Sequence, residues 1–124
     1  MTKSIPIISP VLVSTLNTAR DGTGTVATVV TAAGAGYRIK RIKVKAIVTT
    51  TAGMIRIFLH TGAAFFLWTE IPVTAITVGA DTAGFEYTLE LFNDEALELP
   101  AGYSIRASTH NGESFHVSAE GDYL

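Results

Sequence analysis

Residues 37–50 read YRIKRIKVKAIVTT and contain the clearest periodicity in the chain. From residue 41 onward basic and apolar side chains alternate, which predicts a strand with one dry face and one solvated face. Tyr37 and Ile39 alternate in the opposite phase, so a β-bulge or a crossing between sheets is expected at Lys40 and Arg41. We therefore predict that this segment is the central strand of an all-β domain.

The composition narrows the class of protein. The chain has 124 residues, enough for one domain with a real core, and 48% of them are hydrophobic while only 16% are charged. Part of this apolar excess is expected to be surface that another subunit covers. A net charge of -2 gives no indication of nucleic-acid binding, and the absence of cysteine excludes disulfides and thiolate metal sites.

Residues 1–16 are predicted to form an extended N-terminal arm, followed by a single sandwich domain at 17–124. Pro6 and Pro10 forbid a helix and interrupt the apolar patch, and no signal-peptide cleavage motif follows. An apolar arm of this kind is either a strand at the edge of a sheet or a segment that reaches onto a neighbouring molecule. No membrane-spanning segment is predicted.

The rest of the chain divides into short strand candidates separated by turns, without helical periodicity. They lie at residues 25–31, 54–60, 65–68, 71–78, 85–91, 103–109 and 114–119. Residues 54–70 are predicted to form a β-hairpin, and Asn111-Gly112 predicts a type I′ turn that pairs the last two strands. The expected fold is an antiparallel β-sandwich of eight to ten short strands, with jelly-roll topology as the first expectation.

The run FFLW at residues 65–68 cannot alternate between two faces, because all four side chains are bulky. It is predicted to be either a strand buried on both faces or one whose second face a partner covers. Phe65 and Trp68 are therefore candidate partner contacts.

No convincing catalytic constellation is present. His110, Glu113 and His116 were weighed as metal ligands, but polar residues are expected beside the Asn-Gly turn without a metal. No activated serine motif or phosphate-binding glycine loop occurs. The sequence thus predicts a protein that is not an enzyme and needs no cofactor or metal.

The charges are segregated along the chain. Six of the nine basic residues lie between positions 38 and 56, and six of the eleven acidic residues lie between positions 81 and 98. Pairing between strands of one sheet is the first interpretation, and docking of a basic surface on an acidic partner is the second. A nucleic-acid stripe comes last, because Tyr37 is the only aromatic residue among these basic side chains.

Five segments together resemble small structural proteins of bacteriophage particles. These segments are GTGTVATVVTA, RIKRIKVKA, TTTAGMIRIFLH, LWTEIPV and LPAGYSIRASTH, which lie within residues 22–120. The resemblance implies a β-sandwich protein of the virion, such as a head decoration (cement) protein that sits as a trimer on the outer capsid surface. It implies no catalytic residue.

The expected function is therefore to bind the outer surface of the assembled head and stabilise it, with the major capsid protein as partner and a homotrimer as the first expectation. The protein would be made in the bacterial cytoplasm and reside on the capsid surface. The candidate partner-binding residues are Ile5, Ile7, Ile8, Val11, Arg41, Lys43, Lys45, Phe65 and Trp68. The alternative is a glycan- or receptor-binding module of a tail or fibre, with Trp68 and Tyr103 as stacking residues.

Overall fold

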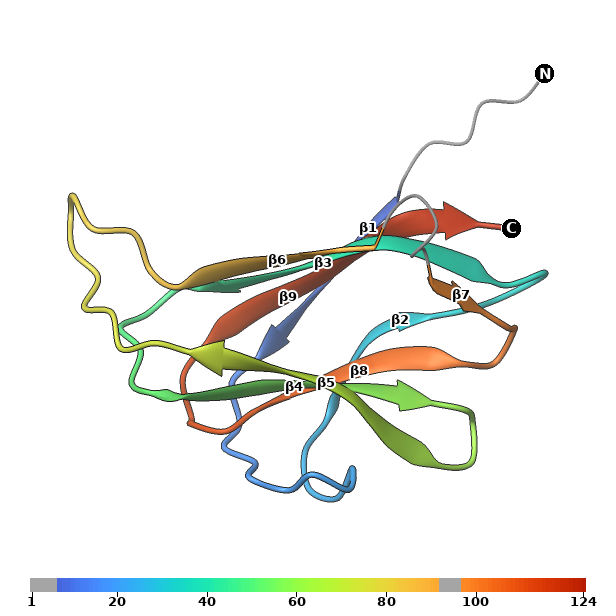
Figure 1. Cartoon of the computed structure of the whole chain (residues 1–124), viewed down its shortest axis with the longest axis horizontal. Helices are drawn as coiled ribbons and strands as arrows, with labels where there is room; N and C mark the ends of the chain where they lie inside the picture. Colours follow the sequence, from blue (N-terminus) through green and yellow to red (C-terminus); the bar gives the residue numbers. More distant parts are fainter. Residues whose placement is uncertain (1–6, 92–96) are drawn as a thin grey trace.

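The computed structural model describes residues 7–91 and 97–124, which form nine strands and no helix (Figure 1). The strands are β1 (Ile7–Val13), β2 (Ala27–Thr31), β3 (Tyr37–Ala46), β4 (Gly53–His60), β5 (Phe65–Val73), β6 (Glu86–Glu90), β7 (Leu97–Leu99), β8 (Ser104–Thr109) and β9 (Phe115–Tyr123).

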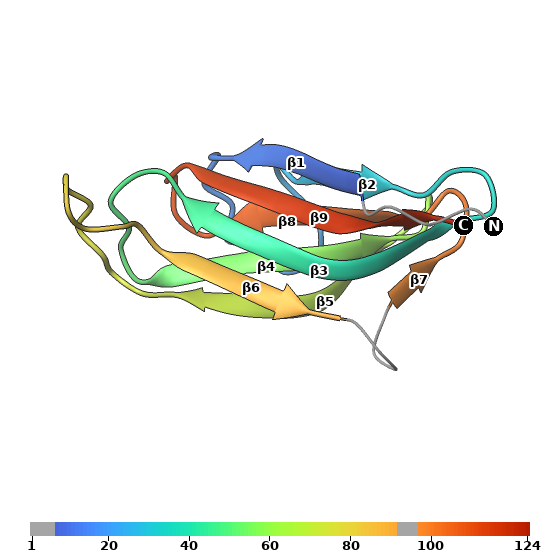
Figure 2. The same ribbon diagram turned by 90° about the horizontal axis from the view of Figure 1, so that it is seen from above.

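The strands form two antiparallel sheets that pack face to face, as Figures 1 and 2 show from two directions. Sheet A has the order β1-β9-β3-β6, and β7 also pairs with β3. Sheet B has the order β2-β8-β4-β5. Because β6 pairs with residues 41–45 and β7 with residues 37–39, the two short strands follow one another along the same edge of β3. The all-β sandwich predicted from the sequence is confirmed.

Strand β3 lies inside sheet A, between β9 and the β6–β7 edge, as its alternation predicted. The register against β9 shifts between Ile39 and Arg41, so Lys40 is an extra residue at the expected position. This bulge keeps Tyr37 and Ile39 on the same buried face as Ile42, although the sequence phase changes between them.

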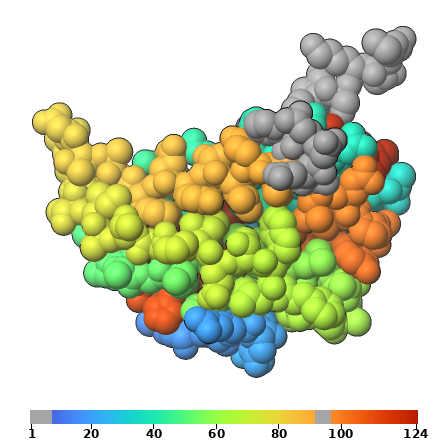
Figure 3. Space-filling view, in the orientation of Figure 1, coloured from blue at the N-terminus to red at the C-terminus, as the bar shows by residue number. Residues whose placement is uncertain are grey.

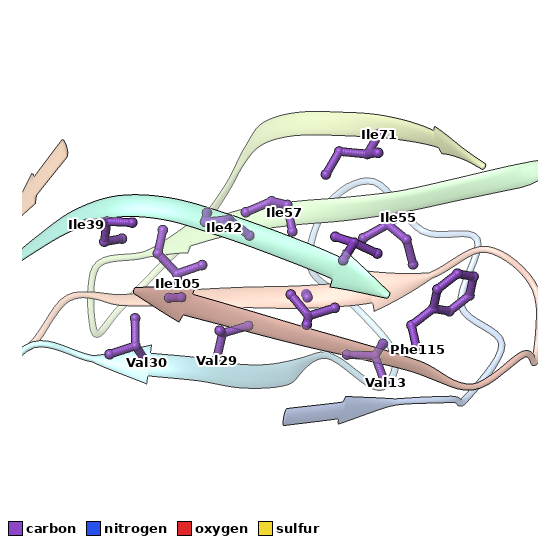
Figure 4. Packing of buried hydrophobic residues seen from close by; sticks show 14 of the residues in the cluster. Val13, Val29, Val30, Ile39, Ile42, Ile55, Ile57, Ile71, Ile105 and Phe115 are labelled. Carbon is purple, nitrogen blue, oxygen red and sulfur yellow. The ribbon is translucent and has the colours of Figure 1, made fainter. Parts of the chain in front are cut away.

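The core lies between the sheets and is made mostly of branched aliphatic side chains (Figure 4). Ile39 and Ile42 of β3 project from sheet A, and Ile55, Ile57 and Ile105 project from β4 and β8 of sheet B. All five side chains are fully buried. Such interdigitation of two inner faces is the main source of stability in a sandwich.

The N-terminal prediction needs correction. Strand β1 pairs with β9 along its whole length, from Ile7 opposite Gly121 to Val13 opposite Phe115. Residues 7–13 thus form an edge strand of sheet A and belong to the sandwich, which was one of the two alternatives for this segment. The expected boundary between an arm and a domain at residue 16 does not separate them. Residues 1–6, including Ile5, lie outside the described part of the chain.

The predicted Asn111-Gly112 hairpin is wrong. Strand β8 belongs to sheet B and β9 to sheet A, so the intervening residues carry the chain from one sheet to the other. Gly112 is absent from the glycines with positive φ, whereas a type I′ turn requires that conformation. The predicted hairpin at residues 54–70 is confirmed, because β4 pairs with β5. The strand expected at 71–78 ends at Val73 as part of β5.

Because of Tyr37, the stability of the fold depends on pH in the alkaline range. Its ring is fully buried and makes an edge contact with Tyr123, with ring centroids 4.9 Å apart. Burial raises the pKa of Tyr37, the nearby Tyr123, Asp122 and Glu120 raise it further, and a hydrogen bond with Ser9 opposes the shift. The folded state therefore favours the neutral phenol, and its contribution to stability is lost as the pH rises above about 10.

We expect Tyr37→Phe to flatten the decline of the free energy of unfolding above about pH 10, because the variant has no buried phenol to ionise. The measurement is urea unfolding at a series of alkaline pH values. Tyr87→Phe is the matched control, because Tyr87 is 42% exposed. An unchanged alkaline decline in Tyr37→Phe would show that another group causes it.

Candidate functional site

The outer face of sheet A carries a row of ion pairs. Basic side chains of β3 lie in the middle, and acidic side chains of β6, β7 and β9 lie on both sides. The pairs are Arg38–Glu98 at 2.8 Å, Lys40–Asp122 at 3.1 Å, Arg41–Glu90 at 3.2 Å, Arg41–Glu120 at 2.8 Å, Lys43–Glu86 at 3.8 Å and Lys45–Glu86 at 3.7 Å. Among the described residues, five basic side chains thus pair with five acidic ones on this face.

This arrangement confirms the first interpretation of the segregated charges, which was pairing between strands. The strongest case is Arg41, whose guanidinium donates to Glu120 and Glu90. These hydrogen bonds, with that to Glu120 first, raise the pKa of Arg41 above its usual value. Arg41, Lys43 and Lys45 are also candidate partner contacts; within the sheet Arg41 pairs with two carboxylates, whereas Lys43 and Lys45 share Glu86.

A row of exposed apolar side chains follows the neighbouring edge strand, β1. Ile8 is 59% exposed and Leu12 is 53% exposed, with the exposed Pro10 between them. Their positions opposite Glu120, Ser118 and His116 place them on the same outer face as the ion pairs. We call Ile8, Pro10 and Leu12 the β1 row.

Val11, another candidate on β1, is not part of this exposed row. Val11 points to the opposite face, where it is partly buried and packs against the core. Ile7 is the first residue of β1, opposite Gly121. The β1 row is thus an exposed apolar strip on an edge strand of sheet A.

The aromatic run lies on β5, the edge strand of sheet B, and this strand lies on the side of the molecule seen in Figure 3. Phe66 is 55% exposed, and Leu67 and Trp68 are each 36% exposed. The register against β4 shifts so that Phe58 lies opposite Leu67 and Ile57 opposite Thr69, which leaves Trp68 as a bulge residue. This bulge explains how four bulky residues fit one strand, and the exposure agrees with the alternative of a face that a partner could cover.

Phe65, in contrast, is partly buried on the outer face of sheet B. Its ring makes an edge contact with Phe58, lies 4.4 Å from the ring of His60 and is covered by the guanidinium of Arg106 at 5.5 Å. Gly22 approaches so closely that a Cβ at this position would overlap the Phe65 ring. Phe65 therefore anchors the β1–β2 connection against sheet B.

That connection, residues 14–26, is held by its own polar side chains. Asn17 donates to the carbonyls of Thr23 and Thr25 at 2.9 Å. Asp21 accepts hydrogen bonds from the hydroxyl and the N–H of Thr23, which lower the pKa of its carboxyl. Arg20 Nε lies 3.3 Å from Glu70 of β5. The connection is thus fixed on the outer face of sheet B (Figure 1).

Beneath this face lies a buried arginine that the sequence analysis did not single out. Arg56 is 3% exposed and its Nε donates to Glu70 Oε2 at 3.0 Å. Both terminal nitrogens of Arg56 lie 3.4 Å from Nδ1 of His110. The signal in the sequence was one charged residue in each strand of a largely apolar hairpin, at positions that the register brings opposite each other.

The three residues weighed as metal ligands do not converge. His110 lies beside Arg56, Glu113 binds Thr51, and His116 is exposed on the outer face of sheet A. Within residues 7–91 and 97–124, no group of three or more histidine, aspartate or glutamate side chains is placed to hold a metal ion.

One end of the sandwich is closed by loops that cross-link through side chains. Thr50 exchanges backbone hydrogen bonds with Ile76, and its hydroxyl donates to the carbonyl of Thr74 at 2.8 Å. The N–H and hydroxyl of Thr51 both donate to Glu113 Oε2, at 2.9 and 2.8 Å. Residues 74–85 project from this same end (Figures 1 and 3). The three loops therefore form one connected surface.

Comparisons with known proteins do not assign the chain to a family. No protein-family model matches the sequence, and no curated protein matches it. Among the residues that the structure describes, no helix has the length and apolar character needed to cross a membrane.

Proposed function

We propose that this chain is a structural protein of a bacteriophage particle that binds the outer surface of the assembled head as a decoration protein. Three things support this proposal: the sequence resemblance to small virion proteins, the all-β sandwich, and the apolar side chains exposed on two separate edge strands. The partner would be the major capsid protein, and the site of action would be the capsid surface.

We also infer that the topology is a jelly roll. If β6 and β7 are counted as one interrupted strand, eight strands divide into two four-stranded sheets in the orders β1-β9-β3-β6 and β2-β8-β4-β5. Neighbouring strands in each sheet come mostly from distant parts of the chain, as the two Greek keys of a jelly roll require. Viral capsid proteins and lectins are among the proteins built on this architecture, so it supports the proposal without selecting it over other functions.

The observation that carries the proposal is the exposed β1 row. Ile8 and Leu12 offer an apolar strip on a rigid edge strand, which suits repeated shallow contacts with a symmetric shell. The neighbouring ion pairs weigh against the basic residues as the main docking element, because opposing charges already neutralise Arg41, Lys43 and Lys45. The exposed aromatic run on β5 would then provide contacts between copies of the protein in a trimer.

The test is co-sedimentation with empty shells assembled from the capsid genes of the genome that encodes this chain. The double variant Ile8→Asn, Leu12→Asn is expected to lower shell affinity roughly tenfold or more, because two apolar side chains no longer leave water on binding. Both side chains are more than half exposed, so the fold should tolerate the change. Circular dichroism and an unfolding curve verify this.

The matched control is Lys43→Gln, Lys45→Gln on the same face. It is expected to change shell affinity by no more than about twofold, because exposed ion pairs contribute little. Equal occupancy by wild-type protein and the β1-row variant would contradict docking through β1. No binding of the wild-type protein to any shell would contradict the decoration function itself.

The glycan- or receptor-binding module remains the second candidate. Trp68 is accessible enough for stacking against a sugar ring. Tyr103, its proposed companion, is partly buried and packs against the core, which weakens this alternative.

A further inference from the structure

A small hydrogen-bonded network joins the β3–β4 loop to the segment that crosses between the sheets. Asn111 Nδ2 donates to Thr51 Oγ1 at 3.0 Å and to the carbonyl of Ala52 at 3.1 Å. Thr51 Oγ1 in turn donates to Glu113 Oε2 at 2.8 Å. Both hydrogens of the Asn111 amide nitrogen are therefore in use, and the carboxamide is held in one orientation.

The residue after Asn111 has a backbone nitrogen that is free to react with this carboxamide. Within the described part of the chain, the N–H of Gly112 makes no hydrogen bond. Gly112 is exposed, and a Cβ there would come no closer than 3.7 Å to any atom outside its immediate neighbours. The backbone nitrogen that follows an asparagine is the nucleophile in asparagine deamidation, and glycine leaves it least hindered. The unbonded Gly112 nitrogen, a nucleophile, thus follows directly on the restrained Asn111 carboxamide, an electrophile.

We propose that Asn111 is a self-modification site at which the protein deamidates, and that Thr51 and Ala52 set the rate by holding the amide. The Gly112 nitrogen loses its proton and attacks Cγ of Asn111, a new C–N bond closes a succinimide, and the amide nitrogen leaves as ammonia with that proton. Water then opens the ring by hydrolysis, which gives aspartate or isoaspartate at position 111. No oxidant, reductant or cofactor takes part.

The modification would loosen this end of the sandwich. A carboxylate at position 111 has no hydrogen to donate to Thr51 or Ala52, so both contacts are lost. It also places a second negative charge beside the Thr51 hydroxyl, which already donates its hydrogen bond to Glu113. Glu113 Oε1 is buried, with no hydrogen-bond partner among the described residues, so the network has no spare donor to offset this repulsion.

The experiment follows deamidation of the purified full-length protein at mildly alkaline pH. Peptide mapping by mass spectrometry detects the exchange of the amide nitrogen for oxygen at Asn111. The native protein is expected to react roughly tenfold more slowly than the same chain unfolded in urea, because the amide must first leave two hydrogen bonds. Thr51→Val is expected to raise the native rate about fivefold, because it removes one acceptor of the amide.

Gly112→Ala is the matched control. It adds a methyl group where there is room and no positive φ, so the fold should persist while the nucleophile is hindered. It is expected to slow deamidation in both the native and the unfolded chain. A native rate equal to the unfolded rate, or no acceleration in Thr51→Val, would overturn the guarding role of the network. The absence of deamidation at Asn111 even in urea would overturn the site.

Discussion

Gly121→Ala is expected to destabilise the protein by about 3 kcal/mol or more, because overpacking against backbone cannot be relieved by a rotamer change. Gly121 lies in β9 between Ile7 of β1 and Ile39 of β3. A methyl group at position 121 would overlap the carbonyl oxygen of Arg38 and would approach Cε1 of Tyr37 to 2.9 Å.

The close approach lies beside the bulge at Lys40. The β3 backbone at Arg38 comes so near to β9 that only a glycine at position 121 leaves room for it. Relief would require β3 and β9 to separate, and these strands pair along most of their length inside sheet A. Loss of this glycine should therefore affect the whole sheet.

Urea unfolding measures the effect, with Gly79→Ala as the matched control. Gly79 lies in the projecting loop, has no atom within 4 Å of an added Cβ and is not in the left-handed region. Its substitution is expected to change the free energy of unfolding by less than about 0.5 kcal/mol. If Gly121→Ala were as stable as Gly79→Ala, the register of β9 against β3 would have to differ from the one described.

Glu70→Ala is expected to cost about 2–4 kcal/mol, somewhat below the loss for a fully buried ion pair, because Glu70 is only partly buried. The variant leaves the guanidinium of Arg56 buried without its carboxylate. His110 offers only a marginal contact at 3.4 Å, which cannot replace a charge-assisted hydrogen bond.

Replacing Arg56 instead of Glu70 should lower the free energy of unfolding by less. Arg56→Met leaves Glu70 partly exposed and still paired with Arg20, so the remaining charge keeps both water and a partner. The double variant Arg56→Met, Glu70→Met should recover most of the stability that Glu70→Ala loses, because an apolar pair of similar size can replace a buried ion pair. A double variant less stable than Glu70→Ala would contradict this expectation, because it would show that an apolar pair cannot replace the ion pair at this place.

Local patterns in the sequence were enough to predict most of the strands, but not which strands pair with one another. The alternation in residues 37–48 predicted β3, its central place and the bulge at Lys40, because a strand with one dry face must keep its phase. The Asn-Gly signal predicted a hairpin that does not form, because pairing is decided by distant strands. Phe115 and Val117 bury their side chains by pairing with β1 and β3, which β8 cannot offer from the other sheet.

The same limit applies to the candidate sites. The segregation of charges predicted pairing between strands, but not that Lys43 and Lys45 share Glu86. The partners Thr51 and Asn111 are far apart in the chain, and no periodicity connects them. Exposure of the β1 row likewise depends on β1 lying at an edge, which only the sheet order reveals.

The position of β9 has a consequence for how the protein is made. β9 comes last of the nine strands in chain order, yet it lies inside sheet A, between β1 and β3. Until β9 is synthesised, β1 and β3 have no common neighbour, and the backbone edges that later pair with it stay open. Sheet A can therefore form only once β9 has emerged, and a chain that lacks β9 is expected to expose two strand edges and to aggregate.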